Sequence, residues 1–180
     1  PNLSILDKID SLHQELKEKH IKSEQQTLAT NILPWIDQEE SKGRSLEEAK
    51  AHFETNKLLN LKKPIPIDST CIRVPVLRSH SQVLTIKLKE DISSQEVEKI
   101  LSTGNEWVTL IPNQRKNSLT ELTPLTSSST FKILVGRVRK LNLPGNIYEV
   151  FTVGDQLLWG ASEPIRRALK LIVDFLHKKG

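Results

Sequence analysis

The chain has 180 residues, of which 37% are hydrophobic and 27% are charged, and its formal net charge is +4 at pH 7. This length and composition suit one soluble domain with a sizeable core and exclude a disordered chain. The single cysteine, Cys71, excludes an internal disulfide. Since there is no charged-then-apolar leader at Pro1 and no long apolar run, we expect no signal peptide, no membrane span and a cytoplasmic protein.

The basic residues give little support for a nucleic-acid partner. Most of them alternate with acids, as in LKEKH, EEAK and EVEK, and only the C-terminal RRALKLIVDFLHKKG is one-sided. Aromatic residues make up 4% of the chain, which leaves few platforms on which bases could stack. We therefore predict that the protein does not bind nucleic acid.

Two helices are predicted in the first third of the chain. Ser4 precedes apolar residues at the spacing of one helical face, namely Ile5, Ile9, Leu12 and Leu16. Ser45, followed three residues later by Glu48, has the spacing of a capping box. This second helix is predicted to run through Leu59.

Two further helices are predicted later in the chain. Ser93 and Glu96 repeat the capping-box spacing. Ser162 is predicted to cap the last helix, where Pro164 is tolerated because it falls in the first turn. The apolar face of this helix comprises Ile165, Ala168, Leu169, Ile172 and Leu176.

The strand candidates are residues 71–77, 83–89, 108–111, 119–122, 131–139 and 148–153, of which 83–89 (VLTIKLK) alternates most clearly. Adjacent strand signals at 71–89 and 131–153 do not follow the strand-helix alternation of a doubly wound fold. We predict an α+β fold with a mixed, largely antiparallel sheet and helices on one face. The run TSSST at 126–130 is predicted to be a surface loop.

Motifs for common cofactors are missing from the sequence. Neither GxGxxG nor GxxxxGK[ST] occurs, so no dinucleotide or P-loop site is encoded in these residues. The histidines lack ligand spacing, and we predict no metal site. Cys71 lies in a predicted strand with no cationic helix terminus beside it in sequence, which favours an inert thiol over a nucleophile.

Charged residues of the helix that follows Ser45 lie on one face. Glu47, Lys50, Glu54 and Lys57 follow one another by three, four and three residues, and the simplest interpretation is a ladder of surface ion pairs.

The stretch CIRVPVLRSHSQ at 71–82 contains Arg73 and His80, seven residues apart. One unbroken strand would place them on opposite faces. Either the two side chains have unrelated roles, or the chain breaks between them.

The same stretch, followed by LTIKLK, resembles the central motif of bacterial aspartate-semialdehyde dehydrogenases. Further segments match the family in its order and spacing: NILPWID at 31–37, EEAKAHFETNKLLN at 47–60, ELTP at 121–124, VGRVRKLN at 135–142 and FTVGDQLLWGASEPIRR at 151–167. The resemblance covers the chain from about Asn31 onwards. It implies a C-terminal domain like that of glyceraldehyde-3-phosphate dehydrogenase.

The resemblance implies a reaction: NADPH-dependent reductive dephosphorylation of L-4-aspartyl phosphate to L-aspartate 4-semialdehyde, with release of phosphate. In such enzymes a cysteine thiolate attacks the acyl phosphate, phosphate leaves and NADPH reduces the resulting thioester. The reaction belongs to lysine, threonine and methionine biosynthesis. A homodimer is the implied assembly.

By the same resemblance, Arg73 holds the substrate α-carboxylate, for which a planar bidentate guanidinium is suited. His80 is the acid/base, a role that histidine suits as a residue type. Glu47 meets the substrate ammonium, and Lys50 helps to bind the phosphoryl group. Gln156 approaches the nicotinamide of NADP.

Since Arg73 and His80 would serve one substrate, we predict that their side chains converge on one cleft. A bulge or turn near Arg78 and Ser79 would bring this about. Several family members carry cysteine where Ser79 stands and Gly-Ala at 75–76, and neither change touches a proposed catalytic group.

Complete enzymes of this family begin with an NADP-binding domain of Rossmann type, followed by the nucleophilic cysteine. Both match positions upstream of this sequence, and Cys71 matches a non-catalytic position. We therefore expect residues 1–155 to form the later part of the catalytic and dimerisation domain. Residues 156–180 would form a C-terminal helix that packs towards the coenzyme domain. The alternatives are a non-catalytic dimerisation module of the same family and an unrelated basic binding domain.

Overall fold

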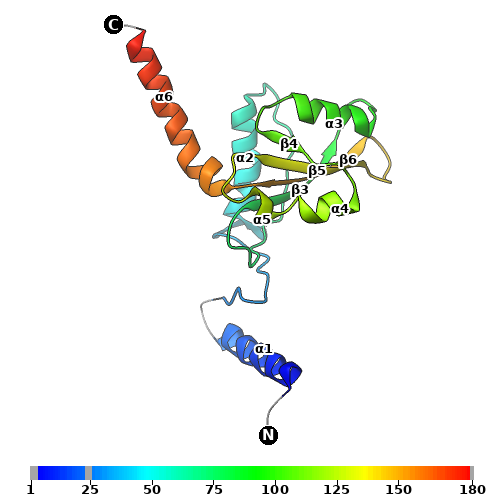
Figure 1. Cartoon of the computed structure of the whole chain (residues 1–180), viewed down its shortest axis with the longest axis vertical. Coiled ribbons are helices and arrows are strands. Elements are labelled where there is room, and N and C mark those ends of the chain that lie inside the picture. Colours follow the sequence, from blue (N-terminus) through cyan, green and yellow to red (C-terminus); the bar gives the residue numbers. More distant parts are fainter. Residues whose placement is uncertain (1–3, 23–25, 179–180) are drawn as a thin grey trace. The chain divides into compact units, whose positions relative to one another are not determined.

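The structure is a computed structural model that describes residues 4–22 and 26–178. The chain divides into two compact units, Pro1–Pro75 and Val76–Gly180. Figure 1 labels the helices and strands along the chain. The division expected between residues 155 and 156 separates the catalytic and dimerisation part from the C-terminal helix by function, not by compactness. It stays a prediction.

In its described residues, the first unit contains two helices and a small two-stranded sheet. It contains α1 (Ile5–Lys22), the short strands β1 (Glu39–Ser41) and β2 (Arg44–Ser45), which pair antiparallel, and α2 (Leu46–Leu59). α1 begins directly after Ser4, as predicted. α2 has the complete predicted capping box: the Glu48 N–H donates to Ser45 Oγ at 3.3 Å, and the Ser45 N–H donates to Glu48 Oε2 at 2.9 Å.

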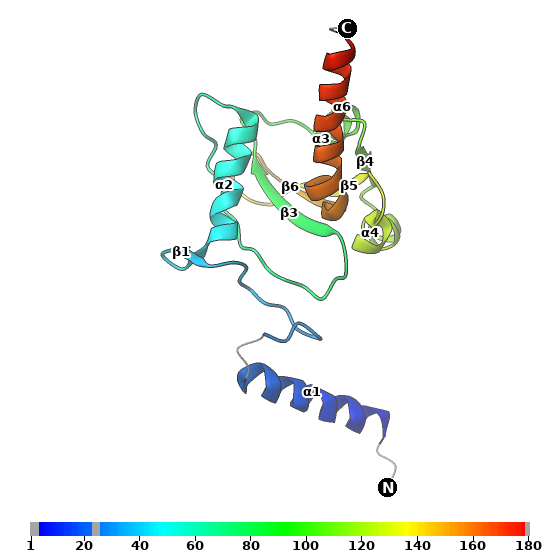
Figure 2. The same ribbon diagram turned by 90° about the vertical axis from the view of Figure 1, so that its left-hand side faces the viewer.

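The second unit is built around a four-stranded sheet in the order β3-β6-β5-β4 (Figure 2). Its elements are β3 (His80–Lys87), α3 (Ser94–Thr103), β4 (Val108–Leu110), α4 (Arg115–Thr120), α5 (Pro124–Ser127), β5 (Ile133–Lys140), β6 (Ile147–Gly154), the π-helix η1 (Leu158–Ser162) and α6 (Glu163–His177). β3 and β5 both pair antiparallel with β6, and only β4 and β5 are parallel. The predicted mixed, largely antiparallel sheet is confirmed.

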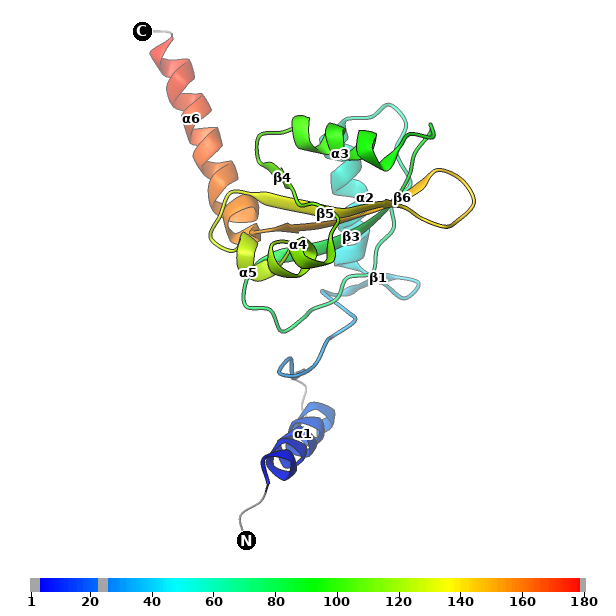
Figure 3. The same cartoon turned by 45° about the vertical axis from the view of Figure 1, so that its right-hand side comes forward.

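Helices lie over both faces of this sheet, whereas the sequence analysis predicted helices on one face only. Leu134 and Val135 are adjacent on β5 and therefore point to opposite faces. Val135 belongs to an apolar cluster against which Val97 and Leu101 of α3 pack. Leu134 belongs to a second cluster with Leu122, which follows α4. Figure 3 shows α3 and α4 on opposite sides of the sheet.

Two strand predictions are wrong. Residues 71–77 form no strand, and Arg73 makes only an isolated antiparallel bridge with Leu33. Pro75 has no N–H to donate to a strand ladder, which explains part of this result. Within residues 119–122, Leu119 and Thr120 end α4, and Leu122 follows the helix and packs in the core. A segment of four residues is too short for its apolar spacing to separate a strand from a helix end.

The predicted surface loop at 126–130 is also wrong in part, since Thr126 and Ser127 belong to α5. Thr123 caps this helix by accepting the Thr126 N–H at 3.2 Å, and Pro124 occupies the first turn. Ser127 is fully buried. The polar composition of this run indicated a loop, but part of it forms a short helix that packs against the core of the second unit.

Ser162 does not cap α6, contrary to prediction. Its backbone is helical (φ −76°, ψ −43°), and its side chain makes no capping bond, because η1 runs directly into α6. The predicted place of Pro164 in the first turn is confirmed. Ile165, Leu169 and Ile172 on the predicted apolar face are all exposed. In the described part of the chain, no helix has the length and apolar character needed to cross a membrane.

Replacing Ser45 by alanine is expected to lower the free energy of unfolding by about 1 kcal/mol. The Ser45 side chain is fully buried, so water cannot easily replace its bond to the Glu48 amide. Ser93→Ala is the matched control, because Ser93 makes the same capping box at α3 in an exposed position. Urea titration of both variants should show the smaller loss for Ser93→Ala, and equal losses would contradict the prediction.

Candidate functional site

Two of the predicted substrate residues, Glu47 and Lys50, meet near the start of α2. Lys50 Nζ lies 3.2 Å from Glu47 Oε2 and 3.1 Å from Asp37 Oδ2. The hydrogen bond to Asp37 first, and that to Glu47 second, raise the pKa of Lys50 above its ordinary value, which keeps the ammonium protonated. Of the predicted ladder, only this Glu47–Lys50 pair forms among the described residues.

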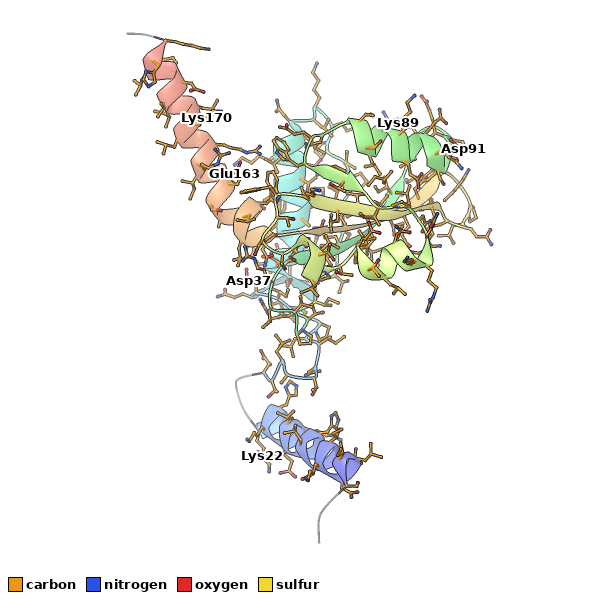
Figure 4. The ribbon with its side chains drawn as sticks, in the orientation of Figure 1. Lys22, Asp37, Lys89, Asp91, Glu163 and Lys170 are labelled. Atoms are coloured by element: carbon orange, nitrogen blue, oxygen red, sulfur yellow. The ribbon has the colours of Figure 1, made fainter. Side chains whose placement is uncertain are left out.

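Arg73 lies at a cavity of about 440 Å³ in the same unit. Its backbone is fixed by two hydrogen bonds of 2.9 Å with Leu33. The cavity is lined by His20, Gln26, Leu33, Pro34, Trp35, Ile36, Asp37 and Arg73. Asp37, labelled in Figure 4, therefore connects the cavity to Lys50. Sequence reasoning assigned Asp37 no role, although it ends the NILPWID motif.

Glu48 ties the chain just before Arg73 to α2. Its Oε1 accepts the Cys71 N–H at 2.9 Å, while Oε2 serves the capping box. The Ser45 N–H first, and the Cys71 N–H second, lower the pKa of the Glu48 carboxyl. The capping-box pattern identified Glu48, but its second bond joins residues 23 apart and gave no sequence signal. Arg73, Glu47, Lys50 and Asp37 thus belong to one connected arrangement.

The Cys71 thiol is poorly suited to act as a nucleophile. Burial is the main cause that raises its pKa above the ordinary value, and the Glu48 and Glu47 carboxylates add to this, while the Ser69 hydroxyl acts in the opposite direction. A raised pKa lowers the fraction of reactive thiolate.

His80 and Gln156 lie at the same end of the β3–β6 pair. His80 is the first residue of β3 and is paired with Gly154 of β6, and Gln156 follows two residues later. Both residues are exposed. The pairing of β3 with β6 therefore brings these two predicted residues, 76 apart in sequence, to one end of the strand pair.

The predicted break before His80 is confirmed. The chain bends at Leu77 and Arg78, and Ser79 has a φ of 80°, an unusual conformation for a residue other than glycine. Such strain often accompanies functional segments. Because Arg73 lies in the first unit and His80 in the second, their convergence on one cleft stays a prediction.

Asp155, between Gly154 and Gln156, was not singled out from the sequence. It is fully buried, and its Oδ2 accepts hydrogen bonds from Arg78 Nε at 2.7 Å and from the Ser129 N–H at 2.6 Å. Burial acts to raise the pKa of this carboxyl, but the Ser129 N–H and the Arg78 guanidinium outweigh burial, so the pKa lies below its ordinary value. Asp155 therefore remains ionised inside the protein.

Glu163, the first residue of α6, pairs with two arginines of the same helix (Figure 4). Its carboxylate is 4% exposed and accepts hydrogen bonds from Arg166 and Arg167 at 2.7 to 2.8 Å. The Arg167 guanidinium lies over Trp107 at 3.9 Å and over Trp159 at 4.9 Å. A cation held over aromatic faces in this way is attracted by them.

Acid is expected to destabilise the first turns of α6 through Glu163. The hydrogen bonds from Arg166 and Arg167 lower the pKa of Glu163 to about 2 from an ordinary 4.5. Because the folded pKa is depressed, this contribution to stability is complete above about pH 4.5 and is lost as the pH falls towards 2. Melting temperatures of the parent and Glu163→Gln should differ at pH 6 and approach each other near pH 2.5. A difference that stays constant over this range would contradict the prediction.

Within residues 4–22 and 26–178, no three His, Cys, Asp or Glu side chains are grouped so as to hold a metal ion.

Similarity to known structures covers nearly the whole chain. Aspartate semialdehyde dehydrogenase from Francisella tularensis matches with a TM-score of 0.87 and 46% identity, over 95% of this chain and 48% of that protein. Aspartate semialdehyde dehydrogenase II from Vibrio cholerae, in complex with ASA, matches with a TM-score of 0.74 and 26% identity, over 89% of this chain and 49% of that protein. The Candida albicans enzyme with NADP has a TM-score of 0.53 at 20% identity, over 73% of this chain and 41% of that protein, and shares the fold.

The chain thus spans about half the length of the solved structures that it matches. Residues 6–159 match the family described as semialdehyde dehydrogenase, dimerisation domain. The match includes Glu47, Lys50, Arg73, His80 and Gln156. The chain therefore belongs to the aspartate semialdehyde dehydrogenase family, of which it is a dimerisation-domain part.

Proposed function

We propose that this chain supplies the acid/base and the substrate-binding residues of an NADPH-dependent aspartate-semialdehyde dehydrogenase. The reaction is the reductive dephosphorylation of L-4-aspartyl phosphate to L-aspartate 4-semialdehyde, a step in lysine, threonine and methionine biosynthesis. The observation that carries this proposal is that Arg73 and Asp37 line one cavity and that Asp37 pairs with Lys50, which in turn pairs with Glu47.

The charges of this arrangement complement those of the substrate. Arg73 presents a guanidinium that can bond both oxygens of the α-carboxylate. Lys50 stays protonated and attracts the phosphoryl group, while Glu47 accepts hydrogen bonds from the substrate ammonium. Asp37 holds Lys50 in place by the bond of 3.1 Å. The complex of the Vibrio cholerae relative with ASA supports a substrate of this kind.

His80 would transfer the proton, since its exposed position at the start of β3 leaves the imidazole accessible. Gln156 is exposed beside it, and its carboxamide both donates and accepts hydrogen bonds, a set that fits the nicotinamide of NADP. NADPH, when bound, would supply the hydride. The NADP in the Candida albicans protein of the same fold is consistent with this choice of coenzyme.

The nucleophilic thiolate would come from outside these 180 residues. Cys71 is the only cysteine, and its raised pKa disfavours the thiolate. We therefore expect the isolated chain to have no dehydrogenase activity.

We also propose that the chain forms a homodimer through its sheet. The family description names a dimerisation domain. β3 is an edge strand whose eight residues are all exposed, and they include the apolar Val83, Leu84 and Ile86. Burying such a surface in a symmetric pair stabilises a dimer.

A chimera tests the proposed activity. In it, this chain replaces the matching 48% of the Francisella tularensis protein, which supplies the remaining part of the enzyme. Phosphate-dependent reduction of NADP by L-aspartate 4-semialdehyde, the reverse reaction, is then followed by absorbance. We expect activity within about tenfold of the Francisella tularensis parent, because the substrate residues are intact.

Cys71→Ser in the chimera is the control, and it should leave the activity unchanged. A folded, dimeric chimera without activity would overturn the catalytic proposal and would favour the non-catalytic dimerisation module. If the isolated chain is active, the proposal that the nucleophile comes from outside these 180 residues is wrong. This holds whether or not the activity survives Cys71→Ser.

A further inference from the structure

Three segments of the second unit meet at the buried carboxylate of Asp155. The first is the bend before β3, which reaches Asp155 through Arg78 Nε at 2.7 Å. The second is the turn after α5, which donates the Ser129 N–H at 2.6 Å. The third is the turn after β6, in which the Leu157 N–H donates to Asp155 Oδ1 at 3.1 Å. One side chain thus fixes the ends of three elements.

The segment before β3 has a second attachment one residue later. Ser79 Oγ lies 2.9 Å from Ser127 Oγ and 3.0 Å from Ser128 Oγ, and Ser127 is fully buried. Ser79 has a φ of 80°, so this backbone conformation is held by its surroundings and not by intrinsic preference. Arg78 and Ser79 therefore determine where the chain enters β3, and His80 is the next residue.

Hydrogen bonds also fix the backbone that follows Asp155. The Asp155 carbonyl oxygen accepts N–H groups from Leu158 at 3.1 Å and Trp159 at 3.0 Å, which closes the helical turn that leads into η1. Gln156 lies inside this turn. The carboxylate of Asp155 is thus the group that connects the backbone around Gln156 with the backbone before His80.

We propose that Asp155 is a positioning residue that fixes His80 and Gln156 relative to each other. The inference rests on the proposed function, because it assumes that His80 and Gln156 serve one reaction. Because Asp155 is fully buried, its carboxylate would not touch substrate or coenzyme. It acts through Arg78 on the entry to β3 and through Leu157 on the turn that carries Gln156. A buried ionised carboxylate can satisfy all three donors, whereas a neutral amide has only one acceptor oxygen.

Asp155→Asn in the 180-residue chain provides the direct test. The side-chain NMR signals of His80 and Gln156 should shift, because one or more of the three segments is released. Tyr148→Phe is the matched control. Tyr148 is buried near the other end of the β3–β6 pair, where its hydroxyl donates to the Ile92 carbonyl and to Asp91. This control should destabilise the same strand pair and leave both signals in place.

Unchanged signals of His80 and Gln156 in folded Asp155→Asn would overturn the proposal. If Asp155→Asn does not fold, Arg78→Gln removes only the bond to the bend before β3. The His80 signals should then shift more than those of Gln156, and unchanged His80 signals would equally overturn the proposal.

The active chimera gives an independent readout. Asp155→Asn is expected to lower kcat by about 10- to 100-fold per folded site, with a smaller change in KM, because displacement by about 1 Å slows catalysis at a correctly bound substrate. A lower melting temperature with unchanged kcat would show a purely structural role and overturn the proposal. An inactive parent chimera would refute the proposed function, and the NMR experiment would still decide the role of Asp155.

Discussion

Replacing His80 by asparagine is expected to lower kcat of the chimera by a factor of about 10² to 10⁴, the usual contribution of a general acid/base. Asparagine retains a polar side chain of similar size but cannot transfer a proton. His80 is exposed at the start of β3 and contributes little to the core, so the melting temperature should change little. Steady-state kinetics and thermal unfolding of the same preparation separate these two effects.

His13→Asn is the matched control, since His13 is exposed on α1 and has no proposed role. It should have the kinetics of the parent chimera. If His80→Asn also turned over at the parental rate, the proton would be transferred by another group, and the assignment of His80 would be wrong.

Arg73→Lys is expected to lower kcat/KM by about 10- to 1000-fold, with a raised KM. Lysine keeps the charge, but its ammonium replaces a planar group that can bond both carboxylate oxygens. The loss of one or two charge-assisted hydrogen bonds accounts for an effect of this size. The backbone bonds between Arg73 and Leu33 do not involve the side chain, so the fold of the first unit should persist.

Arg115→Lys, at an exposed position in the first turn of α4, provides the control for this substitution. Substrate titrations at saturating NADP should show the effect for Arg73 alone. Indistinguishable kcat/KM values for the two variants would mean that Arg73 only supports the local structure.

The local parts of the fold were predictable from the sequence. The capping boxes of Ser45 and Ser93 lie where their spacing places them, since both bonds of each box join residues three apart. The strands β5 and β6 were also predicted to within two residues. Glu47 and Lys50 meet because three residues span nearly one helical turn.

The wrong predictions concern segments without a clear period. Residues 71–77 are apolar and β-branched, yet only Arg73 finds a strand-like partner, Leu33, across 40 residues of sequence. Residues 119–122 were predicted as a strand, but Leu119 and Thr120 end α4 and Leu122 packs with Leu134 of β5 after the helix has ended. In both cases the partner that decides the conformation is distant in sequence.

The sequence by itself determined the family, the helix starts and the residues that bear charge at the proposed substrate site. Only the tertiary structure decided which residues far apart in sequence meet. Asp37 reaches Lys50 across 13 residues, and Arg78 reaches Asp155 across 77. No periodicity encodes such bonds, because they join segments that meet only in the folded chain, as the ends of β3 and β6 do. Burial acts to raise the pKa of Asp155, and the Ser129 N–H and the Arg78 guanidinium that outweigh it meet the carboxylate only once the chain has folded.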